Sequence, residues 1–113
     1  MKFRLTYYLF CSLFILTLAA CSASKSTTST LTYSKDVSKI IDLNCAGCHN
    51  AERPAGGINL TTYENVKEQS VNGKLIPAIQ HAEGVESMPR KSPKLDDVYI
   101  QTIVNWVATG AAV

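Results

Sequence analysis

The chain has 113 residues, of which 46% are hydrophobic, and its formal net charge is +2. This length allows one small domain and little more. The nearly balanced charge argues against a nucleic-acid partner, because phosphate binding needs a strongly basic face.

Residues 1–20 are typical of a secretory signal peptide. Lys2 and Arg4 give a positive start, and residues 5–20 carry no charge and are rich in Leu, Phe, Ile and Tyr. This apolar run is shorter than the roughly 20 apolar residues that a membrane-spanning helix needs. We therefore expect a signal peptide here rather than a transmembrane anchor.

The apolar run ends in the letters LAAC at Cys21, and this ending resembles the lipobox of bacterial lipoproteins. The resemblance implies cleavage before Cys21 and acylation of its thiol, so that the mature chain is attached to a membrane. Ser22 follows the cysteine, which in that family favours transfer to the outer membrane. An ordinary cleavage site and an uncleaved anchor are the alternatives.

Residues 21–31 are expected to be the lipidated cysteine and a flexible tether. The stretch SASKSTTST is rich in Ser and Thr and has no large apolar side chain. Without Lys2 and Arg4, the basic side chains fall from 11 to nine and match the nine acidic ones. The folded domain is expected over residues 32–113, which is a short chain for a stable core of its own.

A helix is predicted from Ser34 to about Asn44, and it leads directly into the stretch Cys-Ala-Gly-Cys-His. Two cysteines three positions apart, followed at once by a histidine, are typical of a c-type haem attachment site. The thiols of Cys45 and Cys48 would form thioethers with the two vinyl groups of one haem, and His49 would bind the iron.

Two other uses of this motif agree less well with the sequence. A zinc site would need four ligands, and the adjacent Cys48 and His49 would have to share one tetrahedron. A thioredoxin-like redox site belongs beside a βαβ unit, and the sequence has no strand pattern. Haem attachment is therefore the interpretation that the motif favours.

The residues after the motif predict short helices separated by turns. A loop rich in Pro and Gly follows at 53–57. A Thr-x-x-Glu pattern that starts at Thr61 is typical of a capping box and predicts a helix to about Ser70. Another short helix is expected over 75–81.

The last predicted helix begins after Asp96, a good N-cap, and ends before Gly110. Leu95 and Ile100 suit a hydrophobic staple at its start. An apolar stripe runs along it, formed by Ile100, Ile103, Val104 and Val107 and widened by Tyr99 and Trp106. We expect this helix to pack on the helix that ends at Cys45.

A second iron ligand can be sought by counting. After residue 20 the chain has one methionine, Met88, and two histidines, His49 and His81. Haem iron takes a second strong ligand such as Met or His. Pro89 disfavours a helical conformation of Met88, so that its side chain should project from an extended loop. Met88 is the predicted ligand, and His81 or an open position is the alternative.

The ordered combination of these motifs resembles class I c-type cytochromes, in particular short bacterial domains with one haem. The residues that carry the resemblance are Cys45, Cys48 and His49, the stretch GGINL at 56–60, Met88-Pro89, and the final helix at 103–107 with Gly110-Ala111. The resemblance implies an all-α fold in which several short helices pack around one covalently attached haem, with the N- and C-terminal helices crossed.

The resemblance also implies residues that support the haem ligands from outside. In this family a proline carbonyl after the motif often orients the imidazole that binds the iron, which makes Pro54 a candidate although it follows His49 by only five residues. Trp106 is the second candidate for such a supporting contact.

The function implied by the resemblance is that of an electron carrier rather than an enzyme. The chain would be anchored by lipid to a bacterial membrane, with the outer membrane favoured. It would face the periplasm and pass single electrons between redox partner proteins, which are expected to be membrane-associated. The alternatives are a haem-based ligand sensor, a haem enzyme such as a peroxidase subunit, and a fixed haem subunit of a larger oxidoreductase complex.

Overall fold

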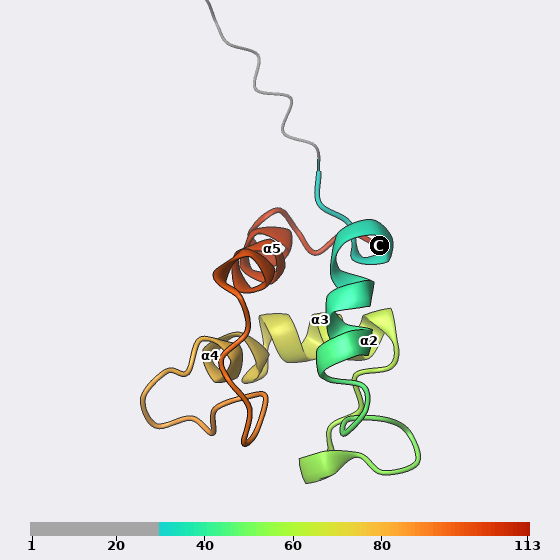
Figure 1. The fold of residues 1–113 in the computed structure, drawn as a ribbon. Helices are drawn as coiled ribbons and strands as arrows, with labels where there is room; N and C mark the ends of the chain where they lie inside the picture. Colours follow the sequence, from blue (N-terminus) through green and yellow to red (C-terminus); the bar gives the residue numbers. More distant parts are fainter. Residues whose placement is uncertain (1–29) are drawn as a thin grey trace, which may run out of the picture.

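A computed structural model describes residues 30–113, so that the predicted signal peptide, the predicted lipidation at Cys21 and most of the predicted tether lie outside the described residues. The described chain is mostly helical (Figure 1). Its elements are the π-helix η1 (Tyr33–Val37), α2 (Ser38–Asn44), the 3₁₀-helix η2 (Ala55–Gly57), α3 (Tyr63–Val71), α4 (Leu75–Ile79) and α5 (Asp97–Ala108).

The β-structure in residues 30–113 consists of two isolated bridges, Thr32 with Ala112 and His49 with Pro54, and no sheet is formed there. This agrees with the predicted all-α class. None of the helices in this part of the chain is long and apolar enough to cross a bilayer.

The first helical segment begins earlier than predicted. Thr32, not Ser34, is its N-cap: the Thr32 hydroxyl accepts a hydrogen bond from the Lys35 amide at 3.3 Å. In return, the Asp36 carboxylate accepts one from the Thr32 amide at 2.8 Å. This reciprocal pair resembles a capping box. The segment runs through η1 and α2 and ends at Asn44, as predicted.

The predicted capping box at Thr61 was wrong by one residue. The Thr62 hydroxyl caps α3 by accepting from the Asn65 amide at 3.3 Å, whereas the Thr61 amide donates to the Asn59 side chain at 2.9 Å. The next helix, α4, ends at Ile79, two residues before the predicted end.

Helix α5 agrees closely with the prediction. Asp96 stands at the N-cap position, although its side chain makes no capping hydrogen bond. Leu95 and Ile100 are both buried, as a staple requires. At the other end Gly110 has φ 101°. The Gly110 amide donates to the Val107 carbonyl and the Ala111 amide to the Trp106 carbonyl, which is the Schellman pattern.

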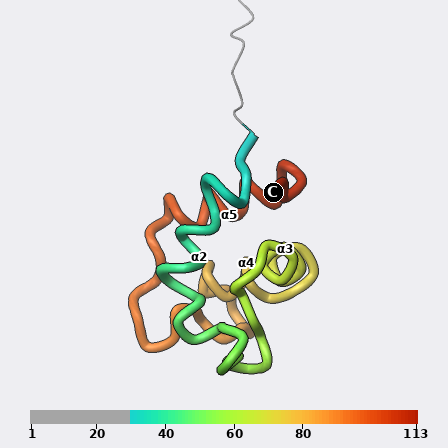
Figure 2. The backbone as a smooth tube through the Cα atoms, turned by 90° about the vertical axis from the view of Figure 1, so that its right-hand side faces the viewer, coloured from blue at the N-terminus to red at the C-terminus, as the bar shows by residue number. Residues whose placement is uncertain are grey.

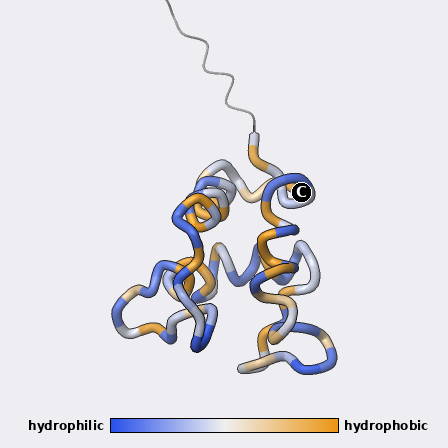
Figure 3. The backbone as a smooth tube through the Cα atoms, viewed as in Figure 1, coloured by the Kyte–Doolittle hydropathy of each residue, from blue (hydrophilic) through white to orange (hydrophobic). Residues whose placement is uncertain are grey.

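The core lies between the first helical segment and α3, α4 and α5. Its buried residues are Val37, Ile40, Ile41, Leu60, Val66, Leu75, Ile79, Leu95, Ile100, Ile103, Trp106 and Ala111. Figure 3 shows hydrophobic segments along both α2 and α5. The predicted apolar stripe of α5 is therefore the face that packs inward, except for Tyr99, which is 41% exposed.

Aromatic rings join the two ends of the described chain. Tyr33 lies 5.5 Å from Tyr63 and 5.9 Å from Trp106, measured between ring centroids. The Ala112 carbonyl accepts from the Tyr33 amide at 2.9 Å and from the Trp106 indole at 2.7 Å. The main contact of helix α5 with the first helical segment is thus at its start, η1. The first and last residues of the described chain lie together in both views (Figures 1 and 2).

Candidate functional site

A single turn at the end of α2 carries the predicted haem-attachment residues. The Cys45 amide donates to the Ile41 carbonyl at 2.8 Å and so closes the helix. The amides of Cys48 and His49 then both donate to the Cys45 carbonyl, at 3.1 and 3.0 Å. The backbone of this turn is therefore internally bonded, and it holds the two thiols and the imidazole on one short scaffold.

The imidazole of His49 is oriented by a backbone carbonyl. Its Nδ1 lies 3.2 Å from the Ile58 carbonyl oxygen. A carbonyl can only accept, so Nδ1 carries the hydrogen and Nε2 keeps its lone pair free. Histidines that bind metals are usually held in this way, because the outer hydrogen bond fixes both the tautomer and the plane of the ring.

The supporting role predicted for Pro54 belongs to Ile58. The Pro54 carbonyl accepts from the Gly57 amide at 2.8 Å and serves the 3₁₀ turn. Pro54 pairs with His49 only through the backbone bridge. The Pro54 carbonyl is thus occupied by the turn, and the chain that continues through η2 brings the Ile58 carbonyl to the ring of His49.

The double glycine makes this return possible. Gly56 and Gly57 have φ of 63° and 76°, a region that residues with a side chain rarely adopt. The pair of glycines was visible in the sequence and could have indicated a reversal at this point. The carbonyl that the reversal delivers could not be identified in advance.

The two thiols differ in exposure, and neither forms a disulfide. Cys48 is exposed, whereas Cys45 is half-buried, and burial raises its pKa to about 11. Redox-active Cys-x-x-Cys sites depend on a lowered thiol pKa, so that Cys45 is not suited to that chemistry. Within residues 30–113 there is also no cluster of three or more His, Cys, Asp and Glu side chains that could hold a metal ion. The geometry therefore does not favour the zinc and thioredoxin-like interpretations.

Met88 is held by the end of α4. Its amide donates to the Ala78 carbonyl at 3.0 Å, and its carbonyl lies 3.1 Å from Nε2 of His81. Met88 is half-buried. His81, the alternative iron ligand, thus uses Nε2 to contact the backbone of the predicted ligand.

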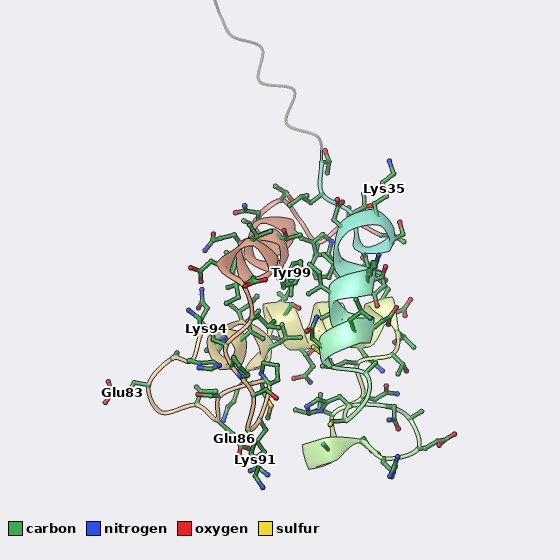
Figure 4. The ribbon with its side chains drawn as sticks, in the orientation of Figure 1. Lys35, Glu83, Glu86, Lys91, Lys94 and Tyr99 are labelled. Atoms are coloured by element: carbon green, nitrogen blue, oxygen red, sulfur yellow. The ribbon has the colours of Figure 1, made fainter. Side chains whose placement is uncertain are left out.

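The Cys-x-x-Cys-His turn and the Met88 loop lie at the same end of the molecule, opposite the chain ends (Figures 1 and 2). A cleft of about 390 Å³ separates the end of α2 from the chain after Met88, and Leu43, Pro89 and Tyr99 are among its lining residues. An open pocket of about 470 Å³ lies beside Cys48 and is also lined by Arg53. Figure 4 shows Tyr99 on the side of α5 that faces α2.

Trp106, predicted to support the haem ligands, serves another part of the fold. It is fully buried, and its indole N–H donates to the Ala112 carbonyl at 2.7 Å. It packs with Tyr33 and Tyr63, near the chain ends. These contacts lie beside η1, and the supporting role of Trp106 at the haem ligands stays a prediction.

Comparisons with protein-family models, with curated proteins and with solved structures found no match for this chain. The interpretation of the site therefore depends on its own geometry.

Proposed function

We propose that the chain is a class I c-type cytochrome with one haem, which carries single electrons between redox partners. One observation carries the proposal: the imidazole of His49, with Nδ1 held by the Ile58 carbonyl, stands on the same turn as the two free thiols of Cys45 and Cys48. Nε2 of His49 is then free to bind iron, and the thiols are free to form thioethers.

Each of these residues has a distinct role in the proposed carrier. Cys45 and Cys48 would hold the haem covalently, and His49 would bind the iron on one side. Met88 would be the second iron ligand through its soft thioether, which would raise the reduction potential and compete with small ligands. When bound, the haem supplies the one-electron couple.

The surroundings of the turn support a haem in this place. Leu43, two residues before Cys45, is 73% exposed in the described chain, and it lines the cleft together with Pro89 and Tyr99. The lining also includes the charged residues Lys94 and Asp96, and its apolar part is suited to contact an apolar planar ligand. A covalent haem would also add apolar surface to a domain whose size leaves it a small core.

A carrier is favoured over a ligand sensor or a haem enzyme by the groups around Met88. An enzyme would need an open iron position and an acid–base group near it, and His81 and Glu83 are the candidates from the sequence. His81 contacts the Met88 carbonyl through Nε2, and Glu83 lies exposed on the outer side of the loop (Figure 4). A fixed subunit of a larger complex would instead be recognised by stable co-purification.

The proposed location follows from the sequence before residue 30. A lipid on Cys21 and the Ser/Thr-rich tether would keep the domain at a membrane, with the outer membrane favoured and the domain facing the periplasm. Tethering raises the effective concentration of partners in the same membrane. Contacts with such redox partners are expected to be small and transient.

The test is to express the full chain with the haem-attachment machinery of a bacterial host and to record ferric and ferrous spectra with and without carbon monoxide. We expect covalent haem and a six-coordinate ferrous spectrum that carbon monoxide does not change. The Cys45→Ala/Cys48→Ala variant should carry no covalent haem, and Cys21→Ala should leave the membrane fraction. Absence of covalent haem from the wild-type chain would overturn the proposal.

A further inference from the structure

We propose that His81 is a positioning residue that fixes the Met88 loop in the geometry needed to bind iron. This inference rests on the proposed function, because it takes Met88 as an iron ligand. It goes beyond that function by assigning to His81 the control of how firmly Met88 is held at the iron and how readily an exogenous ligand replaces Met88.

The contact itself is specific. Nε2 of His81 lies 3.1 Å from the Met88 carbonyl oxygen. Because the carbonyl can only accept, Nε2 must donate. The imidazole of His81 therefore holds the carbonyl group of Met88, on the C-terminal side of this residue. On the N-terminal side the Met88 amide donates to the Ala78 carbonyl at 3.0 Å. Both peptide groups of Met88 are thus fixed, which leaves its side-chain torsions as the main freedom.

Both anchors come from one place, the C-terminal end of α4. The Ala78 carbonyl also accepts from the His81 amide at 3.2 Å, so that His81 and Met88 are tied to the same oxygen. The segment between them includes the exposed residues Glu83, Gly84, Glu86 and Ser87. The position of Met88 is therefore set at the ends of this loop rather than by its exposed middle.

The backbone at His81 is unusual in a way that agrees with this role. His81 has φ 57° and stands directly after the C-cap of α4, Gln80. Glycine is the common residue at such a position, since a side chain disfavours a positive φ. Here a histidine occupies the position, and the left-handed turn directs its ring to Met88.

This arrangement gives His81 a consequence for the ligand bond. Without the imidazole, the Met88 carbonyl loses its donor and the loop gains freedom. The methionine then dissociates more often, and an exogenous ligand competes better for the iron. His81 would act through Met88 and not by binding the iron.

The test compares two variants of the full, haem-loaded chain. In His81→Asn the residue tolerates a positive φ, but its shorter side chain does not reach the Met88 carbonyl. In His81→Gln the amide nitrogen extends about as far as Nε2 does. The readouts are the affinity of the ferric protein for imidazole and the hydrogen exchange of the Met88 amide.

We expect His81→Asn to bind imidazole about tenfold more tightly than the wild type, the factor for the loss of one hydrogen bond. Hydrogen exchange at the Met88 amide should also be faster in this variant. His81→Gln should recover part of both effects. Exchange of the α5 amides is the internal control and should not change.

Equal imidazole affinity and equal Met88 exchange in His81→Asn and the wild type would overturn the inference. So would a general loss of protection that includes α5, because His81 would then stabilise the whole fold. In both cases a Met-ligated wild-type spectrum would leave the proposed function intact. A wild-type spectrum without Met88 ligation would remove the proposed ligand and the inference together.

Discussion

At the scale of single residues, the two cysteines of the motif are not equivalent. Cys45 is half-buried with a pKa raised from 9.0 to about 11, and Cys48 is exposed. Alkylation proceeds through the thiolate, and the lower thiolate fraction is partly offset because a more basic thiolate is more nucleophilic. Below pH 9 we expect the raised pKa alone to make alkylation of Cys45 about tenfold slower than that of a thiol with the ordinary pKa of 9.0.

The measurement uses haem-free full chains in which three of the four cysteines are replaced by serine, so that Cys45 or Cys48 remains. Rates of reaction with iodoacetamide are followed from pH 7 to pH 11. The rate for Cys45 should still rise above pH 10. A Cys45 rate that reaches its plateau near pH 9 would contradict the burial that the structure assigns to this thiol.

Met88 is the residue on which the proposed potential depends. Met88→Ala removes the thioether, and we expect the reduction potential to fall and the ferrous protein to bind carbon monoxide, because the sixth position is then open. Val85→Ala, in the same loop, is the matched control and should change neither property. Potentiometric titration and the carbon monoxide difference spectrum are the measurements. A Met88→Ala protein with the wild-type potential would exclude Met88 as the ligand.

The residues of the candidate site were predictable from the sequence to different degrees. Cys45, Cys48 and His49 carry their chemistry in the side chain and follow one another closely, so a pattern is enough to find them. The support of His49 comes from the Ile58 carbonyl, and every residue has a carbonyl. Which carbonyl contacts the imidazole depends on the path of the chain through η2. No single residue type in the sequence predicts that path.

At the scale of elements, the start of α3 gives a sharp test, because two adjacent threonines compete for the capping role. The Thr62 hydroxyl accepts from the Asn65 amide, while Thr61 bonds to the Asn59 side chain. We expect Thr62→Ala to lower the free energy of unfolding by about 1 kcal/mol, the usual cost of losing an N-cap. Thr61→Ala is the control and should cost less than half as much.

Urea unfolding of the haem-loaded chain, followed by far-ultraviolet circular dichroism, measures both variants. A larger loss in Thr61→Ala than in Thr62→Ala would favour the capping box predicted from the sequence over the one in the structure.

Helix boundaries explain where prediction from the sequence succeeded and failed. For α5 several independent signals coincide: Asp96 at the start, the buried pair Leu95 and Ile100, and Gly110 at the end. For α3 the neighbouring Thr61 and Thr62 both suit an N-cap. The choice between them follows from the path of the preceding loop, where the Asn59 side chain accepts from both the amide and the hydroxyl of Thr61.

At the scale of the whole molecule, the chain ends and the candidate site lie at opposite ends (Figures 1 and 2). The described chain begins at residue 30, next to the bridge between Thr32 and Ala112. A tether that joins the domain there would direct the Cys-x-x-Cys-His turn and the Met88 loop away from the attachment point. This orientation suits the proposed carrier, whose haem would have to reach partners away from the membrane.

The aromatic cluster of Tyr33, Tyr63 and Trp106 holds the two ends of the described chain together. Trp106→Phe keeps a buried ring but removes the indole donor to the Ala112 carbonyl. Tyr63→Phe removes the hydroxyl donor to the Ala111 carbonyl, at 2.9 Å. We expect Tyr63→Phe to lower the free energy of unfolding by about 1 kcal/mol, the net value of one hydrogen bond. Trp106→Phe should lower it by more, because the smaller ring also leaves a cavity at a fully buried position. Tyr99→Phe is the control, because Tyr99 is 41% exposed. This variant should change the free energy of unfolding by no more than about 0.5 kcal/mol.

The double variant Trp106→Phe/Tyr63→Phe decides whether the two hydrogen bonds act as one closure. Both donors bind adjacent carbonyls of one short segment, and the rings contact one another with centroids 6.4 Å apart. Residues in contact show non-additive effects, so the double variant should lose less stability than the sum of the single variants once the segment has been released. Strict additivity in urea unfolding would mean that the two ends of the chain are held by independent contacts. The spectrum of the haem-loaded protein should stay unchanged in all three variants, because the cluster lies at the end of the molecule opposite the candidate site.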